Sequence, residues 1–159
     1  MAKKRKKKGH TGKIIATNRI ARHEYFIENT HEAGLVLHGW EVKRFRAGQV
    51  QLKDSYINFH QGEAWLIASH ISPLLSASTH INPNPNRQRK LLLHDYEISR
   101  LQAAIDRKGN AIIPLSLYWK NNHIKIEIGV GKGKKLHDKR ASAKERDWNR
   151  DKARIMKNN

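Results

Sequence analysis

The chain has 159 residues, with 32 Lys or Arg against 14 Asp or Glu, and no Cys. This length allows one domain with room for tails. The lack of Cys excludes disulfide frameworks, thiolate metal sites and Cys nucleophiles. No apolar run is long enough to span a bilayer, and the N-terminal basic run lacks the apolar segment of a secretory signal. We therefore expect a soluble, cytoplasmic protein.

The formal net charge of +18 is concentrated at the two ends. Residues 1–22 carry +9 and residues 131–159 carry +7, whereas residues 23–130 carry only +2. Cationic segments repel themselves and bury too little apolar surface to offset the entropy of ordering. We predict a disordered basic arm over 1–12, a folded domain over 13–130 and a basic tail over 131–159. Nucleic acid is favoured as the partner over a membrane, because neither end has a broad apolar face.

The first half of the central region predicts strands and one short helix. Aromatic and β-branched residues predict a strand over 23–28, which ends at Asn29-Thr30, and a short strand over 35–37. A short helix is predicted over 39–48, with Gly48 at its end. Segments 55–60 and 64–68 predict a β-hairpin, and the alternation of Asn and Pro over 82–86 predicts a loop.

The second half predicts a helix and another hairpin. A helical period of apolar residues covers 91–107 and stops at Lys108-Gly109. Segments 111–119 and 123–130 predict a hairpin whose second strand alternates Ile with charged residues. About six strands without βαβ alternation favour a mainly β fold with short α-helices. The best single architecture is a small closed antiparallel β-barrel of the oligonucleotide-binding type, with disordered basic termini.

The tail has a different pattern from the domain. Residues 144–157 favour a helix with acid–base pairs at i,i+3 spacing, but the apolar positions form only a thin seam of Ala141, Trp148 and Ile155. Such a seam cannot hold a helix onto a core, so we predict a tail that is disordered when free and helical when docked. The Gly- and Lys-rich stretch 129–134 lacks the residues of a phosphate loop and is interpreted as a flexible hinge.

No common catalytic constellation is present in the sequence. His23-Glu24 begins like a zinc-protease motif, but Ile27 stands where the second His is required. The other spaced histidines share no helix face, and there is no G-x-S-x-G elbow. We therefore expect no enzymatic activity, no metal and no cofactor.

Basic residues interleaved with aromatics are typical of RNA recognition. The candidate RNA-facing aromatics are Tyr25, Tyr56, Tyr118 and Trp119, although the core needs many of the aromatics for packing. Trp148 is a candidate interface anchor, because its surroundings are highly charged. From the residues alone, a structural ribosomal protein and an RNA-processing enzyme remain alternatives to an RNA-binding factor.

Several blocks in the same order then resemble one family, the small protein B or SsrA-binding proteins of bacterial trans-translation. The resemblance runs from about residue 13 to the end and rests on residues 18–28, 32–34, 39–43, 87–94 and 133–140. Two departures are Arg44, where the family commonly has Ser, and Gly131, where it commonly has Ala; we expect Gly131 to loosen the hinge slightly.

The resemblance implies a non-enzymatic, monomeric protein that binds the tRNA-like domain of transfer-messenger RNA. It also implies delivery of this RNA, together with elongation factor Tu, to ribosomes that have stalled without a stop codon. The body would stand in for the missing anticodon arm. The tail would enter the decoding centre and the empty mRNA channel of the small ribosomal subunit and become helical there.

The resemblance also implies roles for particular residues. Glu32 would accept hydrogen bonds from a base edge or an RNA hydroxyl, or orient a neighbouring arginine, with a surface salt bridge as the alternative. The residues predicted for RNA binding are Asn18, Arg19, Arg22, Tyr25, Glu32, Leu92, Lys125, Lys132, Gly133, Lys134 and Lys135. The residues predicted for the decoding centre and mRNA channel are His137, Asp138, Lys139, Arg140, Arg146, Trp148, Ile155, Met156 and Lys157.

Overall fold

The computed structural model describes residues 12–73, 83–107 and 109–157. The predicted arm over 1–12 lies outside the described residues except for its last position. The strands in the described part are β1 (Ile14–Thr17), β2 (Tyr25–Leu35), β3 (Tyr56–His60), β4 (Glu63–Ile67), β5 (Arg89–Leu92), β6 (Asn110–Lys120) and β7 (His123–Gly133). The helices are α1 (Ala21–Glu24), α2 (Gly39–Arg46), α3 (Asp95–Asp106) and α4 (Leu136–Lys157).

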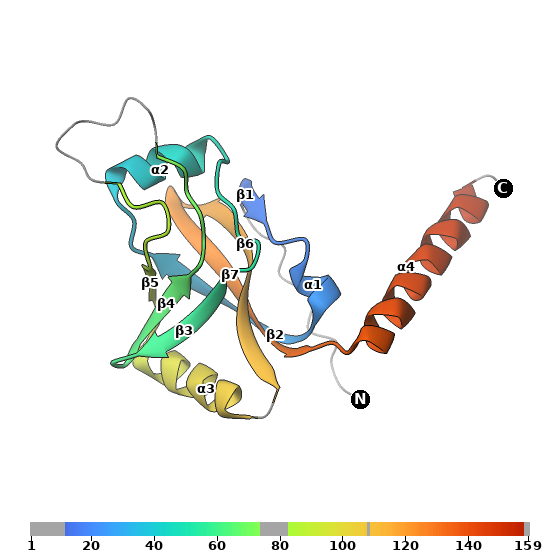
Figure 1. Cartoon of the computed structure of the whole chain (residues 1–159). Coiled ribbons are helices and arrows are strands. Elements are labelled where there is room, and N and C mark those ends of the chain that lie inside the picture. The colour runs from blue at the N-terminus through green and yellow to red at the C-terminus, as the bar shows by residue number, and fades with distance from the viewer. Residues whose placement is uncertain (1–11, 74–82, 108, 158–159) are drawn as a thin grey trace.

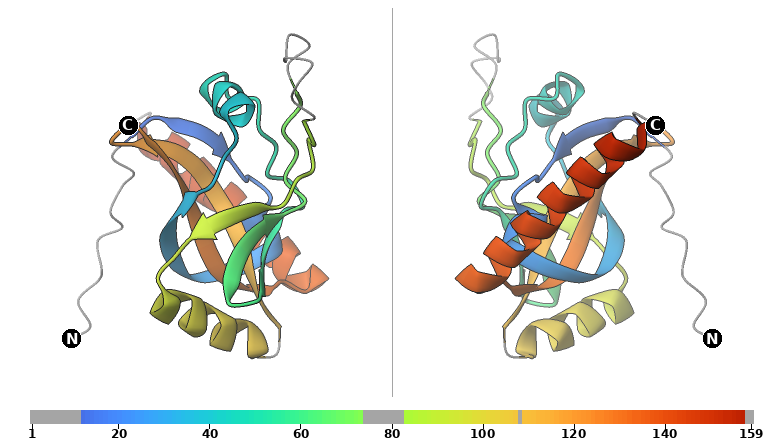
Figure 2. Two further views of the ribbon diagram at one scale, coloured as in Figure 1. Left: turned by 90° about the vertical axis from the view of Figure 1, so that its left-hand side faces the viewer. Right: turned by 90° about the vertical axis from the view of Figure 1, so that its right-hand side faces the viewer.

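All the strands join one antiparallel sheet in the order β1-β6-β7-β2-β5-β4-β3. The sheet curves strongly, with α2 at one end of it and α3 at the opposite end (Figure 1, Figure 2). Helix α4 projects away from the sheet (Figure 1). The mainly β fold with short helices is therefore confirmed, apart from the length of α4.

The predicted closure of the barrel is not confirmed. In the described part of the chain, β1 and β3 are the two edges of an open sheet. Strand β3 comes within 8 Å of β6 between Cα atoms, but the two share no ladder of hydrogen bonds. A pocket lies between them and is lined by residues of both strands.

Both predicted hairpins, the helix near 39–48 and the loop after 82 are confirmed within a few residues. The strand predicted over 23–28 is confirmed only for 25–28, and the separate strand predicted over 35–37 is wrong. His23 and Glu24 end α1, and segments 25–28 and 35 belong to a single strand, β2. The polar residues Asn29-Thr30, which predicted the end of the strand, instead follow a β-bulge between Ile27 and Asn29. Strand β2 continues through the bulge, because β7 pairs with it on both sides.

The helix predicted over 91–107 begins only at Asp95. Leu91 pairs with both Leu35 and Ala64, so residues 89–92 form the central strand of a three-strand ladder. Tertiary pairing here overrides a helical apolar pattern. Strand β1 was not predicted, and it pairs with β6 along one edge of the sheet.

The last strand runs beyond its predicted end. Strand β7 continues to Gly133 and pairs with residues 25–27 of β2, so the stretch interpreted as a flexible hinge is largely sheet. Gly131 does not loosen a hinge, since it lies inside this ladder, where a Cβ would be 2.9 Å from the carbonyl oxygen of Phe26. The division of the chain into a domain and a tail remains a prediction.

The main core fills the concave side of the sheet. Ile126 and Ile128 of β7, Leu91 of β5 and Phe45 of α2 are all almost completely buried there. A second, smaller cluster on the other face joins Ala21 of α1 to β6, with partly buried residues of β2 packed against it. The short α1 is thus held against the sheet by apolar packing.

A charged network fastens α2 to β5 inside the protein. Glu41 of α2 and Arg89 of β5 are fully buried, and Nε of Arg89 lies 3.1 Å from the Glu41 carboxylate. Arg87 donates to the same carboxylate from Nε and Nη2, at 3.0 and 2.7 Å. The backbone N–H of His38 donates to Glu41 as well, and Arg89 also donates to Ser69. Both buried charges are therefore paired and hydrogen-bonded.

Acid should weaken this network. Burial raises the pKa of Glu41, but the hydrogen bonds from Arg87 and His38 and the charges of Arg89 and Arg87 outweigh it, so the pKa lies below its ordinary value. The unfolded chain then binds this proton more readily than the folded protein does. The stabilisation is complete above the unfolded pKa of about 4.3 and is lost as the pH falls through the lower folded pKa.

We therefore expect the contribution of Glu41 to the free energy of unfolding, from urea titrations, to decrease as the pH falls below about 4.3. In the folded protein, the Glu41 Cδ resonance followed by NMR should titrate below about 4.3. A Glu41 titration above that value would contradict the expectation.

Candidate nucleic-acid interface

The structure distributes the predicted RNA-binding residues over three places. Asn18 and Arg19 lie in the connection between β1 and α1. Glu32, Leu92 and Lys125 share one face of the sheet, and we call them the strand-face cluster. The others gather where α1, β2 and the end of β7 meet the start of α4, a region we call the α1–α4 junction: Arg22, Tyr25, Lys132, Gly133, Lys134 and Lys135.

Strand register assembles the strand-face cluster. Gly34 of β2 lies between Lys125 of β7 and Leu92 of β5. Glu32, two residues away on β2, lies on the same face, while Ala33 points into the core. A Cβ on Gly34 would lie 3.3 Å from the Cβ of Leu92, so the glycine leaves room for this exposed leucine. The result is an apolar side chain flanked by a cation and an anion on one surface.

Glu32 is tied into this surface by hydrogen bonds. Its carboxylate accepts from the hydroxyl of Tyr118 and from Nζ of Lys120 at 2.9 Å. Burial raises the pKa of Glu32, but the two hydrogen bonds and the charges of Lys120 and Lys125 outweigh it, so the pKa lies below its ordinary value. The surface salt bridge left open by the sequence is therefore present. Contact of Glu32 with RNA remains a prediction.

The candidate aromatics differ in their exposure. Tyr118 is 2% exposed, between the cross-strand neighbours Ile14 and Lys125, so its prediction as an RNA-facing ring is wrong. Burial and the negative charge of Glu32 raise the pKa of its hydroxyl, which stays neutral. Trp119 packs partly against the main core. Tyr56 is exposed.

Asn18 is almost buried. Its side-chain amide donates to the carbonyl of Pro114 at 3.0 Å, and its backbone N–H donates to the carbonyl of Leu115 at 2.8 Å. These bonds fix the connection between β1 and α1 on strand β6 and leave the neighbouring Arg19 exposed. The structure thus gives Asn18 a positioning role, which sequence spacing alone did not indicate.

The α1–α4 junction is held largely by polar contacts. The backbone N–H of Lys134 donates to the carbonyl of Glu24 at 2.8 Å, and its Nζ lies 3.0 Å from the carbonyl oxygen of Arg22. The same ammonium group lies 4.8 Å from the centre of the Phe26 ring. Lys134 therefore fastens the end of β7 to α1 and β2.

Two further contacts join α4 itself to α1. Nζ of Lys139 lies 3.5 Å from the Glu24 carboxylate, and Nη2 of Arg146 lies 3.2 Å from Nδ1 of His23. Solvent-exposed ion pairs of this kind contribute little stability. Because no residue of α4 is buried, the first half of the helix is attached to the domain mainly by these polar contacts.

The side chains in the second half of α4 are exposed. Trp148, Ile155 and Met156 are each more than 60% exposed, on a helix that also carries eight Lys or Arg and four Asp or Glu. Such exposed apolar side chains among charges are typical of a surface that meets a partner. The helix begins earlier than predicted, at Leu136, and includes all the residues predicted for the decoding centre and mRNA channel.

Comparison with known proteins identifies the family. Residues 15–158 match the family model described as SmpB protein. The chain belongs to the SmpB family. Proteins called SsrA-binding protein from Alkalilimnicola ehrlichii and Chromohalobacter salexigens are each 56% identical to it, over 96% of this chain and 95% or 98% of theirs.

One solved structure, described as "tmRNA-SmpB: a journey to the center of the bacterial ribosome", is also similar. Its sequence is 39% identical and the TM-score is 0.65. The aligned region covers 80% of this chain and 93% of that one. The resemblance inferred from residues 18–28 and the later blocks is thus confirmed. The strand-face cluster and the α1–α4 junction both lie within the part of the chain that the family model matches.

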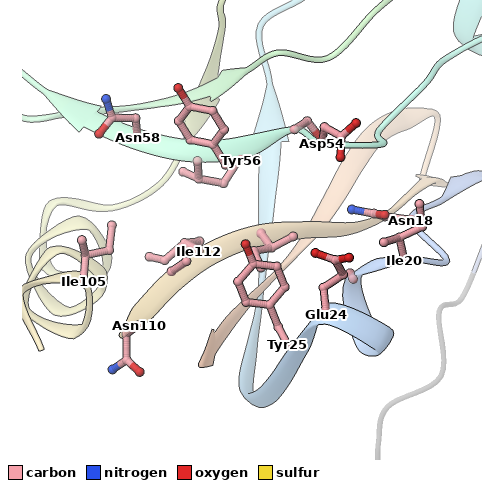
Figure 3. A pocket seen from close by; sticks show the side chains of 15 residues that line it. Asn18, Ile20, Glu24, Tyr25, Asp54, Tyr56, Asn58, Ile105, Asn110 and Ile112 are labelled. Atoms are coloured by element: carbon pink, nitrogen blue, oxygen red, sulfur yellow. The ribbon is translucent and has the colours of Figure 1, made fainter. Parts of the chain in front are cut away.

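A pocket of about 440 Å³ lies in the gap between β3 and β6 (Figure 3). Tyr25 from β2 and Tyr56 from β3 lie on opposite sides of it, with Ile112 beside Tyr25 in this view. The carboxylates of Glu24 and Asp54 lie toward the end where Asn18 is found. Both tyrosines are candidates from the sequence, but no sequence pattern joins them, because they come from distant segments.

Two absences apply to the described residues. No three His, Asp or Glu side chains there are grouped as metal ligands would be. His60 instead stacks on Trp65, and His70 lies 2.9 Å from the Asn86 side chain, while His80 lies outside the described residues. Within the same ranges, no helix is long and apolar enough to cross a membrane.

Proposed function

We propose that this chain binds the tRNA-like domain of transfer-messenger RNA and delivers it to stalled ribosomes in trans-translation, without catalysing a reaction. Membership of the SmpB family is the observation that carries the proposal. The strand-face cluster supplies an exposed leucine, a lysine and a carboxylate on one surface, which suits contact with base edges and hydroxyls rather than with phosphates alone.

The two parts of the molecule take different roles in this proposal. The domain occupies the place of an anticodon arm, and the tail enters the decoding centre and the empty mRNA channel of the small ribosomal subunit. The exposed apolar residues and net positive charge of α4 support this assignment. Because α4 buries no residue in the domain, docking on rRNA would supply most of its stability, and the free tail would be disordered.

The proposal also covers the compartment, the oligomeric state and a protein partner. The protein acts as a cytoplasmic monomer, and elongation factor Tu accompanies it in the delivery complex. Neither a membrane nor a resident cofactor takes part.

Capture from the native bacterium tests the proposal. The full-length protein is pulled from a lysate of its own source cells, and the bound RNA is sequenced. One dominant structured RNA with a tRNA-like end is the expected result. A broad RNA mixture, or rRNA alone in near-stoichiometric amount on salt-washed ribosomes, would contradict the proposal and favour a structural ribosomal protein.

Replacing Glu32 by alanine should weaken binding to the tRNA-like domain about tenfold, since hydrogen bonds to a base edge are worth a factor of this order. The loss of the Tyr118 and Lys120 contacts should lower the free energy of unfolding by only about 1 kcal/mol. Fluorescence anisotropy with labelled RNA measures the first quantity and urea denaturation the second.

Glu63→Ala is the matched control for this variant. Glu63 also pairs with a lysine, Lys90, at 2.7 Å, and the side chains of both pairs are exposed to nearly the same extent. We expect the control to change RNA affinity less than about twofold. Equal losses in the two variants would remove Glu32 from the RNA-binding surface.

A further inference from the structure

We propose that the pocket between β3 and β6 holds one unstacked guanine base of a bound RNA chain. The inference rests on the proposed function only in assuming that this chain binds RNA. It adds a base-specific site, distinct from the strand-face cluster, and names Tyr25, Tyr56 and Asp54 as its main residues.

The shape of the pocket suits a single flat group. Its volume of about 440 Å³ lies within the usual range of small-molecule sites. Tyr25 and Tyr56 both line it and lie on opposite sides of it in the view of Figure 3. Ile57 and Ile112 add apolar surface. Aromatic and apolar walls are the surroundings that unstacked bases prefer in proteins.

The charge of the pocket excludes a phosphate as its occupant. Glu24 and Asp54 are the ionisable carboxyl groups that line it, and no Lys or Arg is among its lining residues. A cavity with only negative charge is unusual in a protein of net charge +18. The occupant should therefore be neutral or cationic and should present hydrogen-bond donors.

Guanine matches these donors best among the RNA bases. Its N1–H and N2–H₂ groups point in the same direction and can both donate to one carboxylate, which accepts at two oxygens. On the corresponding edges of adenine, cytosine and uracil no two donor groups are adjacent, because the neighbours of each donor are acceptors. Asp54 is the better candidate for this carboxylate, because Glu24 already lies 3.5 Å from Nζ of Lys139.

The RNA backbone can be held at the rim. Arg19, Arg22 and Lys53 are exposed, and each is next in sequence to residues that line the pocket. Cations next to the pocket and carboxylates in its lining would separate phosphate contacts from base contacts. The hydrogen bonds that fix Asn18 on β6 also fix the backbone beside Arg19.

The test uses three labelled single-stranded RNAs and the full-length protein. One RNA is an oligouridylate, the second has a single central guanosine, and the third has inosine, which lacks the N2 amino group, at that position. Anisotropy titrations at about 200 mM salt reduce the contribution of the basic ends. We expect the guanosine RNA to bind about tenfold more tightly than the oligouridylate and the inosine RNA to lose part of this gain.

Tyr56→Ala and Asp54→Asn should each abolish the preference for guanosine. Tyr96→Ala, at an exposed tyrosine of α3 outside the pocket, should retain it. Thermal unfolding of all variants shows that each is folded. Equal binding of the guanosine and uridine RNAs by the unchanged protein, or a preference that survives in both pocket variants, would overturn the inference.

The same titrations separate this inference from the proposed function. Binding of the unchanged protein to the tRNA-like domain of transfer-messenger RNA is measured alongside. Strong binding to that domain without any guanosine preference rejects the pocket alone. A guanosine preference without affinity for that domain rejects the proposed partner and supports the pocket.

Discussion

Replacement of Glu41 by glutamine should destabilise the protein by about 3–5 kcal/mol, the cost typical of removing one partner from a buried ion pair. The reason is the fully buried guanidinium of Arg89, whose Nε lies 3.1 Å from the Glu41 carboxylate. Glutamine can accept from one arginine but leaves a buried positive charge without its counter-ion. Arg87 is less affected, because its side chain is 23% exposed and water can reach it.

Urea denaturation followed by circular dichroism at neutral pH measures this loss. Glu63→Gln is the matched control, because it removes the same charge from the half-exposed pair with Lys90, and it should cost less than about 1 kcal/mol. A Glu41→Gln variant as stable as this control would show that the network contributes nothing beyond a surface ion pair.

Arg89→Met, combined with Glu41→Leu, provides a second measure. Apolar replacement of both buried charges is often neutral or stabilising, because it removes their desolvation cost. Arg87 would still lose its partner, so we expect the double variant to recover much, though not all, of the stability lost by Glu41→Gln. Recovery would show that the cost lies in the unpaired charge rather than in the packing of α2 against β5.

Truncation after Arg140 should abolish the tagging of incomplete proteins on stalled ribosomes while leaving the affinity for the tRNA-like domain within about threefold. The deletion removes most of α4, including Trp148, Ile155 and Met156, but retains the strand-face cluster and the basic end of β7. Since no residue of α4 is buried, the free energy of unfolding should change by less than about 0.5 kcal/mol.

A full-length variant with Trp148, Ile155 and Met156 all changed to alanine is the charge-matched control for this truncation. It keeps every basic residue of the tail, so a loss of tagging would come from the exposed apolar side chains rather than from missing charge. A reconstituted translation system with a stop-less mRNA measures tagging, and anisotropy measures RNA affinity. A large loss of RNA affinity on truncation would contradict the division between domain and tail.

The sequence predicted the parts of the fold whose signals are local. Alternating Ile residues at 124, 126 and 128 and the turn at Asn121-Asn122 predicted the β6–β7 hairpin, and Gly48 marked the end of α2. It failed where pairing across the sheet outweighed local preference. Leu91 carries a helical pattern but pairs with Leu35 and Ala64, and the stretch after Val130 carries a hinge-like composition but pairs with β2.

For the candidate site too, the sequence identified single residues, and the tertiary structure decided which of them share a surface. The resemblance picked out Glu32, Leu92 and Lys125 individually, and only the register around Gly34 brings them onto one face. Tyr118 was indistinguishable by sequence from an exposed aromatic, but its neighbours on β1 and β7 bury it. The residues around the pocket come from five elements and two connections, and no spacing rule links them.

Charge, composition and motif order, which are properties of the chain itself, determined that this protein has two cationic ends and belongs to the SmpB family. Whether the sheet closes, where the buried charges meet and which side chains share a surface were decided only by the tertiary structure. These features depend on contacts between residues far apart in the chain, whose energies outweigh local preferences of about 1 kcal/mol per residue. Local sequence records those preferences but not the distant partners.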